Sequence, residues 1–550
     1  MFSIILAVAL IYFLWFNMYR YFLPNPVLKS SESTYLQNHK HDLVKWVTWG
    51  PETLAMAKKQ NKPLFISIGF ATCYGCRVMK HESFRNPLIA KIINRYYVPI
   101  LIDRYQQPRI DEIYINLLDY QKNMSGWPTT VLATPDGIPL FLSTYEPKDN
   151  FKKALTLIAK DWAKQSSVTQ AKALKWADRY AESKAVIPRS PFNDPRVDLT
   201  QFLVNAFDTR FGGMGKRQKF PLFLHWSQLI MLSPDYFTYG KQTTDKILTS
   251  PLFDFIEGGV HRYSSTRDWR NPHFEKIFID QVHFVQLLTQ LYSITKEPLY
   301  LDLAVFNVSF ILNNFQTESG QFMTGLDAGD LFESGLYYYF RDDFLDDLSP
   351  LSFERVSVGN YQNLSALMNP KDFYGIDQSP LINKRKNSNV QLQKDHFVSI
   401  QHNAQFLISL LYLNQWVKSS DYQKVIERLM DFLVNQPFQT LSPMTLLVVY
   451  DALSSITVPM DFSELESLIR SRLNPTFPFY TPLPYVLPQL QVMDYTDSDH
   501  SPQALYYLLK HRQKLLIGYT DATMCSDLSK VIVFPWNQLS LVKIYNTSCQ

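Results

Sequence analysis

The chain has 550 residues, of which 46% are hydrophobic and 15% are aromatic, and its formal net charge is +4. This length exceeds one ordinary core and indicates roughly two to four domains. The charge is small and no block of basic residues occurs, which excludes a typical nucleic-acid-binding protein. Four cysteines in so long a chain exclude a small scaffold held together by disulfides.

The first 23 residues are strongly apolar. An almost unbroken apolar run covers residues 2–16, and it reaches the length of a membrane span if Arg20 extends its charge to the interface. A cleaved signal peptide or a buried helix is the alternative, but no Lys or Arg precedes the run and no small-x-small cleavage site follows it. We expect residues 1–23 to form a single-pass membrane anchor with an aromatic belt at its distal end.

The side of the membrane follows from two opposing arguments. Arg20 and Lys29 lie beyond the apolar run and favour a cytoplasmic body by the positive-inside rule. A working pair of thiols on an anchored protein favours the oxidising side. We expect the body to be extracytoplasmic.

Residues 42–166 alternate between helical and strand patterns. This alternation predicts a domain with a small mixed α/β sheet. The expected helices cover residues 51–60, 110–118 and 150–164, and the expected strands cover 64–68, 97–102, 131–134 and 140–143. The turn Pro135-Asp136-Gly137 between the last two strands predicts a hairpin, because proline presets one dihedral angle and glycine accepts a positive one.

Two cysteines spaced C-x-x-C, Cys73 and Cys76, stand where the strand over 64–68 gives way to a helical pattern. The free N–H groups at a helix start favour a thiolate, and Arg77 adds a positive charge. The alternatives are half of a zinc site or two inert structural thiols, and zinc would require two further ligands, for which no second C-x-x-C or C-x-x-H is near. We expect thiol–disulfide exchange, with Cys73 attacking and Cys76 resolving.

The order of these elements resembles the thioredoxin fold. A C-x-x-C after a core strand is followed some fifty residues later by an aromatic residue, Pro128 and Thr129, before another strand. In that fold the proline is cis and lies against the dithiol. The resemblance therefore implies that Pro128 is the third residue of the site and that protein dithiols or disulfides are its clients.

The second half of the chain has a different texture. After a helical linker over 167–197, residues 198–515 contain apolar segments with helical period, at 278–292, 300–314, 402–416, 422–433 and 444–453. Paired helices over some 300 residues predict a toroid or an α-solenoid. A segment over 516–550 follows, in which Cys525 and Cys549 form a late staple, a resolving pair or two idle thiols.

Unusual residues gather in the loops of this helical region. The candidate pocket residues are His261, Arg262, Trp269, His273, Glu275 and Asp327. They fit a buried polar network, a ligand site without turnover, or a sugar-type site in which Glu275 and a histidine act as acid and base. No phosphate-binding or dinucleotide-binding glycine pattern occurs in the required context, so we expect neither a cofactor nor a metal.

Together the motifs resemble the spermatogenesis-associated protein 20 family and its bacterial relatives. The matching residues, between about 45 and 340, are Ser67-Ile68-Gly69, Cys73 and Cys76, Met79 to Phe84, Asp103-Arg104, Gly126-Trp127-Pro128, Thr134 to Gly137, Gly258-Gly259 with His261-Arg262-Tyr263, and Pro272 to Lys276. The resemblance implies a multidomain α/β plus all-α protein, with a thioredoxin-like domain followed by an (α/α)6-type helical domain. It suggests a divergent, membrane-anchored, bacterial-type member.

The chain departs from the family at the positions that tune the thiols. The family usually has His-Trp between the cysteines and His after them, where this chain has Tyr74-Gly75 and Arg77. The family's acidic patch is thinned to Asp327-Ala328-Gly329-Asp330, and a later Asp-Asp-Lys and Trp-Asn motif is reduced to Asp395-His396 and Asn403. The resemblance therefore implies a retained redox pair and a helical domain that has lost part of its chemistry.

The expected function is thiol–disulfide exchange by a membrane-anchored protein, fused to a helical toroid of unknown ligand. One alternative is a carbohydrate-binding or carbohydrate-modifying toroid, of the epimerase or glycosidase kind, with an accessory thioredoxin domain. Another is a scaffold whose thioredoxin unit is degenerate.

Overall fold

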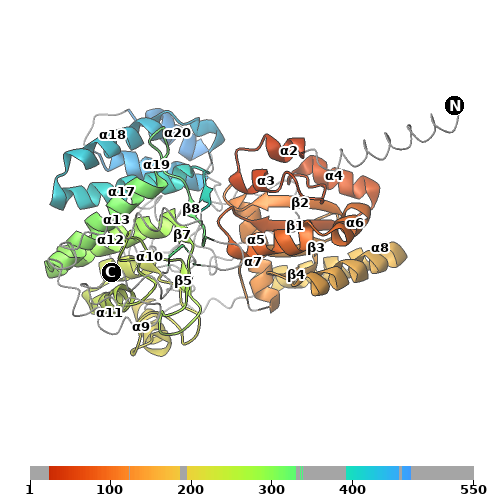
Figure 1. The fold of residues 1–550 in the computed structure, drawn as a ribbon, viewed down its shortest axis with the longest axis horizontal. Helices are drawn as coiled ribbons and strands as arrows, with labels where there is room; N and C mark the ends of the chain where they lie inside the picture. Colours follow the sequence, from red (N-terminus) through yellow and green to blue (C-terminus); the bar gives the residue numbers. More distant parts are fainter. Residues whose placement is uncertain are drawn as a thin grey trace, which may run out of the picture. The chain divides into compact units, whose positions relative to one another are not determined.

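The computed structural model describes residues 24–122, 124–185, 195–329, 335, 337–338, 392–441, 443–456 and 461–471. The described residues divide into two compact units, one ending at 185 and the other beginning at 195. The first unit is a mixed α/β domain and the second is built of helices (Figure 1). The predicted fold class, an α/β domain followed by a large all-α domain, is confirmed.

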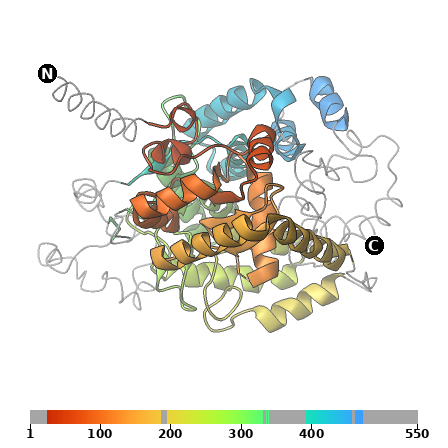
Figure 2. The ribbon, with the colours of Figure 1, turned by 90° about the vertical axis from the view of Figure 1, so that its right-hand side faces the viewer.

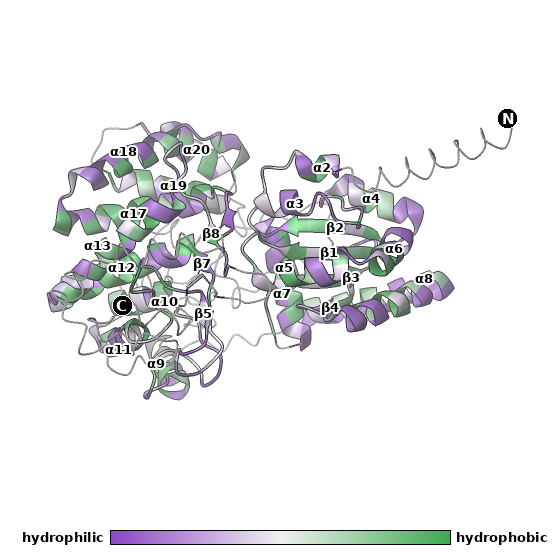
Figure 3. Ribbon diagram, in the orientation of Figure 1, coloured by the Kyte–Doolittle hydropathy of each residue, from purple (hydrophilic) through white to green (hydrophobic). Residues whose placement is uncertain are grey.

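A four-stranded sheet forms the centre of the first unit, with strand order β2-β1-β3-β4. Strand β1 (Leu64–Gly69) runs parallel to β2 (Val98–Asp103) and antiparallel to β3 (Thr129–Ala133), which pairs with β4 (Pro139–Ser143) as a hairpin. Every residue of β1, β2 and β3 is buried. Helices therefore cover both faces, and the strands are mostly apolar (Figure 3).

Helices flank this sheet along the chain. They are α4 (Pro51–Gln60), α5 (Tyr74–Met79), the π-helical turn η1 (Lys80–Phe84), α6 (Pro87–Tyr96), α7 (Pro108–Lys122) and α8 (Lys148–Ala185). The start of α6 shows why the sequence folds this way: Asn86 accepts hydrogen bonds from the backbone N–H groups of Leu88 and Ile89, and Pro87 has the first helical position. Both features satisfy or remove donors that a helix start leaves unpaired.

Two short helices precede the region where the sequence predicts the domain to begin. They are α2 (Pro26–Lys29) and α3 (Thr34–Asn38), and Ser33 caps α3 by accepting a hydrogen bond from the N–H of Leu36. Tyr35 and Leu36 of α3 are buried. Helix α3 thus contributes Tyr35 and Leu36 to the interior of the first unit.

Helix α8 is longer than the sequence pattern indicates. Gln165 has a non-helical backbone conformation, with φ −154°, where two helical stretches meet. In the second stretch Ala173, Ala177 and Tyr180 join the hydrophobic core around the sheet. Helix α8 also packs beside α6 (Figure 2).

The second unit consists of helices that pack in pairs, as expected of a toroid-like domain. The described helices are α9 (Pro195–Ala206), α10 (Phe223–Leu232), α11 (Phe237–Leu248), α12 (Phe278–Thr295), α13 (Pro298–Phe315), α17 (Ile400–Val417), α18 (Ser420–Val434), α19 (Pro443–Ser454) and α20 (Ser463–Ser471). Helix α12 packs against α10, α13 and α17, and α17 packs against α18 and α19. The five segments predicted to be helical correspond to α12, α13, α17, α18 and α19.

Short strands connect these helices. Strand β5 (Tyr263–Ser264) pairs with β6 (Pro272–His273), and β7 (Lys276–Ile277), β8 (Gly325–Leu326) and β9 (Lys394–Asp395) form a three-stranded sheet. All of these pairs are antiparallel. They bring together loops that are distant in sequence.

The membrane prediction is corrected. In the part of the chain that the structure describes, no helix is both long and apolar enough to cross a membrane. The predicted anchor over residues 1–23 lies outside the described residues. The transmembrane segment, the signal anchor and the extracytoplasmic membrane localisation are therefore not carried further.

Candidate functional site

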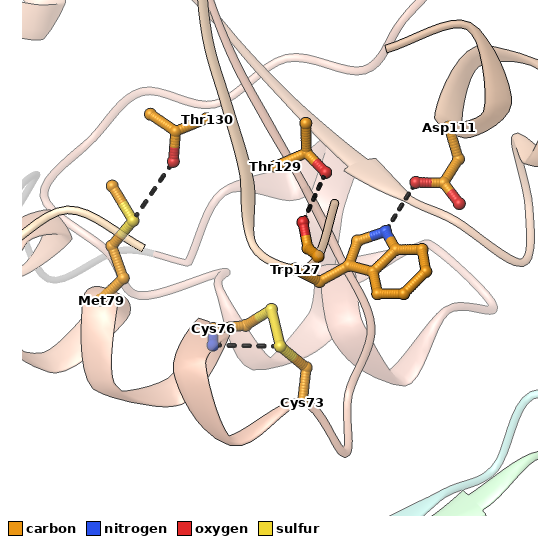
Figure 4. Close-up of a disulfide and its surroundings, with 8 residues drawn as sticks. Cys73, Cys76, Met79, Asp111, Trp127, Thr129 and Thr130 are labelled. Carbon is orange, nitrogen blue, oxygen red and sulfur yellow. Dashed lines mark hydrogen bonds between the residues drawn. A yellow bond between two sulfur atoms is a disulfide. The ribbon is translucent and has the colours of Figure 1, made fainter. Parts of the chain in front are cut away.

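Cys73 and Cys76 are joined as a disulfide at the start of α5. Cys73 is the residue that caps the helix, and the backbone N–H of Cys76 donates a hydrogen bond to Cys73 Sγ at 3.1 Å (Figure 4). This N–H is one of the donors that a helix start leaves free, and it favours negative charge on the sulfur once the disulfide is opened. The predicted placement of the cysteines at a strand-to-helix junction is confirmed.

The loop before β3 lies directly against the turn between the two cysteines. The Trp127–Pro128 peptide bond is cis, as the resemblance to the thioredoxin fold implies. A β-carbon on Gly75 would lie 3.2 Å from Pro128 Cδ and 3.3 Å from the backbone oxygen of Trp127. The absence of a side chain at position 75 therefore lets the dithiol turn and the proline loop make close contact.

The side chain of Trp127 is fixed by a charged pair. Its indole N–H donates to Asp111 Oδ1 at 2.7 Å, as Figure 4 shows. Arg104 lies 3.8 Å from the centre of the indole ring, and its Nε is 3.3 Å from the other carboxylate oxygen of Asp111. The ring is thus held by a hydrogen bond on its edge and a cation on its face. The sequence predicts neither contact, because Asp111 and Arg104 come from different elements.

A second group of polar side chains lies behind the cysteines. Asp103, at the end of β2, is buried and accepts a hydrogen bond of 2.5 Å from the hydroxyl of Ser33. Tyr35 of α3 lies over Gly69, where its hydroxyl and Cys76 Sγ approach the same point. The sequence pattern did not indicate Ser33 and Tyr35 as site residues, because both precede the region predicted to form the domain. Ser33 as a helix cap was the available signal.

In the helical unit two loops repeat one arrangement. Asp208 is followed by Gly212 and Gly213, and Asp254 by Gly258 and Gly259, and all four glycines have positive φ angles. In each loop a buried lysine from a later segment donates to the aspartate and to the first glycine's carbonyl: Lys219 at 2.7 and 2.6 Å, and Lys276 at 2.7 and 2.8 Å. These charges are paired and hydrogen-bonded, which is how buried charges are tolerated.

Trp269 comes from a later segment and packs on the first of these loops. Its backbone has φ 66°, its indole N–H donates to the carbonyl of Phe211 at 2.7 Å, and its ring covers Gly213. Arg267 donates to both oxygens of Asp208, at 2.6 and 2.9 Å. Burial raises the pKa of Asp208, but the hydrogen bonds from Arg267 and Lys219 overcome it and hold the pKa well below its ordinary value. Trp269 therefore fixes a loop here.

Other predicted pocket residues do come together, on the β5–β6 hairpin and the residues after it. His273 stacks on Tyr263, with 4.0 Å between ring centres, while Arg262 is half-buried and Glu275 is buried. Burial lowers the pKa of His273 and Arg262 lowers it further, whereas Glu275 opposes the change. Burial, with Glu275, raises the pKa of Tyr263 to about 12. These residues form one electrostatically linked group.

His261 and Asp327 are tied into the loops by hydrogen bonds. His261 is buried, and its Nδ1 lies 3.0 Å from the carbonyl of Phe274. Asp327 is also buried, and its Oδ1 accepts from the N–H groups of Gly329 and Gln393, both at 3.0 Å. These contacts agree with the polar-network interpretation. The sugar-site interpretation stays a prediction.

Some predicted features lie outside the described residues. They are Asp330, Cys525, Cys549 and the segment over 516–550. Asp395 and Asn403, the remnants of the later family motif, are described. Asn403 is buried and exchanges hydrogen bonds of 2.9 Å with the backbone of Phe322, so it joins α17 to the loop before β8.

Comparison with known families and proteins supports the thioredoxin-like class. Residues 25–180 match the family model Thioredox_DsbH, described as "Protein of unknown function, DUF255". The chain is similar to spermatogenesis-associated protein 20 of Mus musculus, with 27% identity over 410 residues, 69% of this chain and 51% of the relative. The Homo sapiens protein is 26% identical over 415 residues, 70% of this chain and 51% of the relative. The homologues of this chain thus include spermatogenesis-associated protein 20.

The chain spans about half the length of the curated relatives it matches. These relatives, from Mus musculus and Homo sapiens, do not support the expected bacterial-type, membrane-anchored assignment. Among solved structures, the cellobiose 2-epimerase of Bacillus thermoamylovorans is similar with a TM-score of 0.31 and 10% identity, covering 64% of this chain and 85% of that one.

Proposed function

We propose that the first unit carries out thiol–disulfide exchange through Cys73 and Cys76. The observation that supports this most directly is their arrangement: the pair is bonded at a helix start, and the turn between them touches the Trp127–Pro128 loop. A helix start lowers the pKa of a cysteine and so increases the fraction of thiolate, which is the attacking species.

In the reducing direction the Cys73 thiolate attacks one sulfur of a client disulfide. A Cys73–client disulfide forms and the other client sulfur leaves as a thiolate. Cys76 then loses its proton and attacks Cys73 Sγ, which releases the second client thiolate and leaves the Cys73–Cys76 disulfide. The client has gained two electrons and the protein dithiol has lost them. The same steps in reverse oxidise a client dithiol.

A scaffold with a degenerate thioredoxin unit is the second candidate. One observation favours it: Cys73 and Cys76 are each only 2% exposed. A client must displace neighbouring side chains before it can reach Cys73 Sγ. A structural disulfide is usually covered in this way. An experiment therefore has to distinguish thiol–disulfide exchange from a scaffold function.

The test is insulin reduction by the full chain with dithiothreitol as the electron source. We expect turnover by the natural sequence and loss of turnover in Cys73→Ser. Cys76→Ser, reduced and then freed of dithiothreitol before insulin is added, should accumulate a mixed disulfide with the insulin chain, since the resolving thiol is gone. The matched control is the double variant Cys525→Ser, Cys549→Ser, which should keep full activity. If neither turnover nor a trapped mixed disulfide is observed, the exchange function is rejected and the scaffold function remains.

A further inference from the structure

A tyrosine from outside the C-x-x-C motif shares a confined space with the resolving cysteine. A β-carbon on Gly69 would lie 2.6 Å from the hydroxyl oxygen of Tyr35 and 2.7 Å from Cys76 Sγ. Real β-carbons do not approach other atoms so closely, so these two atoms occupy the volume that a side chain at position 69 would need. Gly69 ends β1, and Tyr35 comes from α3.

The hydroxyl of Tyr35 is buried and available for a hydrogen bond. The residue is fully enclosed, and within the described ranges its hydroxyl oxygen has no hydrogen bond of normal geometry. The Ser67 hydroxyl on β1 is near enough to influence Tyr35, yet the two oxygens do not meet that geometry. A buried hydroxyl without a partner costs free energy, which calls for an explanation in a site of this kind.

Burial and the nearby carboxylates keep the proton on the Tyr35 hydroxyl. Burial raises the pKa of Tyr35 well above its ordinary value, and the carboxylates of Asp103 and Asp42 raise it further, while Ser67 lowers it. The Asp103 carboxylate already accepts hydrogen bonds from Ser33 and from the N–H of Tyr105. Tyr35 is therefore a hydrogen-bond donor over the whole physiological range, and it is not a base.

We propose that the Tyr35 hydroxyl donates a hydrogen bond to the Cys76 thiolate that exists while the disulfide is open, and so is a catalytic residue supplied by α3. This inference rests on the proposed exchange function. When a client thiolate attacks Cys73 Sγ, the Cys73–Cys76 bond breaks and a client–Cys73 bond forms. The electron pair passes to Cys76 Sγ, which approaches the same point over Gly69 as the Tyr35 hydroxyl does. No proton transfer from Tyr35 is required.

This contact acts in both directions of exchange. A stabilised thiolate is a better leaving group when the protein disulfide is opened. In the reducing direction it increases the fraction of Cys76 that is ready to attack the mixed disulfide. Removing the hydroxyl should therefore slow exchange without disturbing the sheet.

The test is Tyr35→Phe, which keeps the ring and removes the hydroxyl. In a background of Cys73→Ser, Cys525→Ser and Cys549→Ser, Cys76 is the one remaining thiol of the full chain, and its titration is followed by the ultraviolet absorbance of the thiolate. We expect Tyr35→Phe to raise the pKa of Cys76 by about one unit, or about tenfold less thiolate at a given pH, as for the loss of one hydrogen bond to a charged group.

Tyr114→Phe is the matched control. Tyr114 is another buried tyrosine of the same unit, but its hydroxyl donates to the carbonyl of Gly137 at 2.9 Å. Its removal should reduce stability and leave the pKa of Cys76 unchanged. Tyr35→Phe should raise the pKa of Cys76 and leave stability unchanged. An unchanged Cys76 pKa in a folded Tyr35→Phe protein would overturn the proposal.

A second substitution covers the case in which Tyr35→Phe does not fold. A ring-fluorinated tyrosine at position 35 keeps the shape but is a stronger donor, and it should lower the pKa of Cys76. A shift in the opposite direction, or no shift, counts against the proposal. Because the titration needs no client, it gives its answer even where insulin reduction fails and the exchange function is lost.

Discussion

At the residue scale, two glycines determine how tightly the dithiol is packed. Gly75 allows the proline loop to touch the turn between the cysteines, and Gly69 leaves space that Tyr35 and Cys76 fill. The contact at Gly75 joins the turn between the cysteines to the proline loop, and the one at Gly69 joins the end of β1 to α3 and α5.

Gly69→Ala should destabilise the first unit by about 1–3 kcal/mol, the usual cost of overpacking a core. The new methyl group would collide with the Tyr35 hydroxyl, Tyr35 Cζ and Cys76 Sγ, all within 2.8 Å. Urea unfolding followed by circular dichroism measures the change.

The matched control for this change is Gly50→Ala. Gly50 has an extended backbone, with φ 171°, and nothing lies within 4 Å of its would-be β-carbon. Its substitution should leave stability unchanged or slightly improved. Equal effects of the two substitutions would show that the crowding at Gly69 is not what matters.

At the element scale, short loops of the helical unit are fixed by buried ion pairs. The Lys219–Asp208 and Lys276–Asp254 pairs have side chains that are at most 3% exposed, with Nζ to Oδ2 distances of 2.7 Å. Each lysine also holds a glycine carbonyl of the same loop. A buried pair contributes little net stability, but removing one partner leaves a buried charge. The two loops are thus sensitive to loss of either lysine.

Lys276→Met should reduce the free energy of unfolding by about 3 kcal/mol, because the carboxylate of Asp254 loses its ammonium partner. Lys241→Met is the comparison, since Lys241 pairs with Asp245 at 3.0 Å on a partly exposed surface, and such pairs contribute about 0.5 kcal/mol. Denaturant midpoints of the two variants distinguish them. A loss in Lys276→Met as small as that in Lys241→Met would contradict the structural role of the pair.

At the scale of the whole molecule, the first unit has a core of its own. The hydrophobic cluster around its sheet draws its residues from between Trp49 and Tyr180. The second half of α8 contributes Ala173, Ala177 and Tyr180 to it, so the unit ends later than the sheet does. A domain of about 160 residues buries enough surface to fold alone.

Residues 24–185, expressed alone, should therefore unfold in one cooperative thermal transition. A version ending at residue 166 lacks the second stretch of α8 and should melt at a lower temperature, because three buried core residues are lost. Circular dichroism melts of the two fragments provide the measurement. Identical melting temperatures would show that the second stretch of α8 adds nothing to the core.

The sequence by itself determined the local order of this protein: the strand before Cys73, the helix after it, the hairpin around Pro135, and the helical segments of the second half. Local periodicity and turn chemistry contain that information. It also supported, through resemblance, the place of Pro128. It was wrong about the membrane anchor, because an apolar run indicates burial without saying what covers it.

Only the tertiary structure decided which distant side chains meet. The Tyr35 hydroxyl and Cys76 Sγ approach the same point over Gly69, with α3 packed against β2, and Trp127 is held by Asp111 and Arg104 from other elements. Trp269 was grouped in the sequence with His273, yet it covers a separate loop. Such contacts depend on packing between segments that have no periodic relation to one another, so spacing along the chain does not encode them.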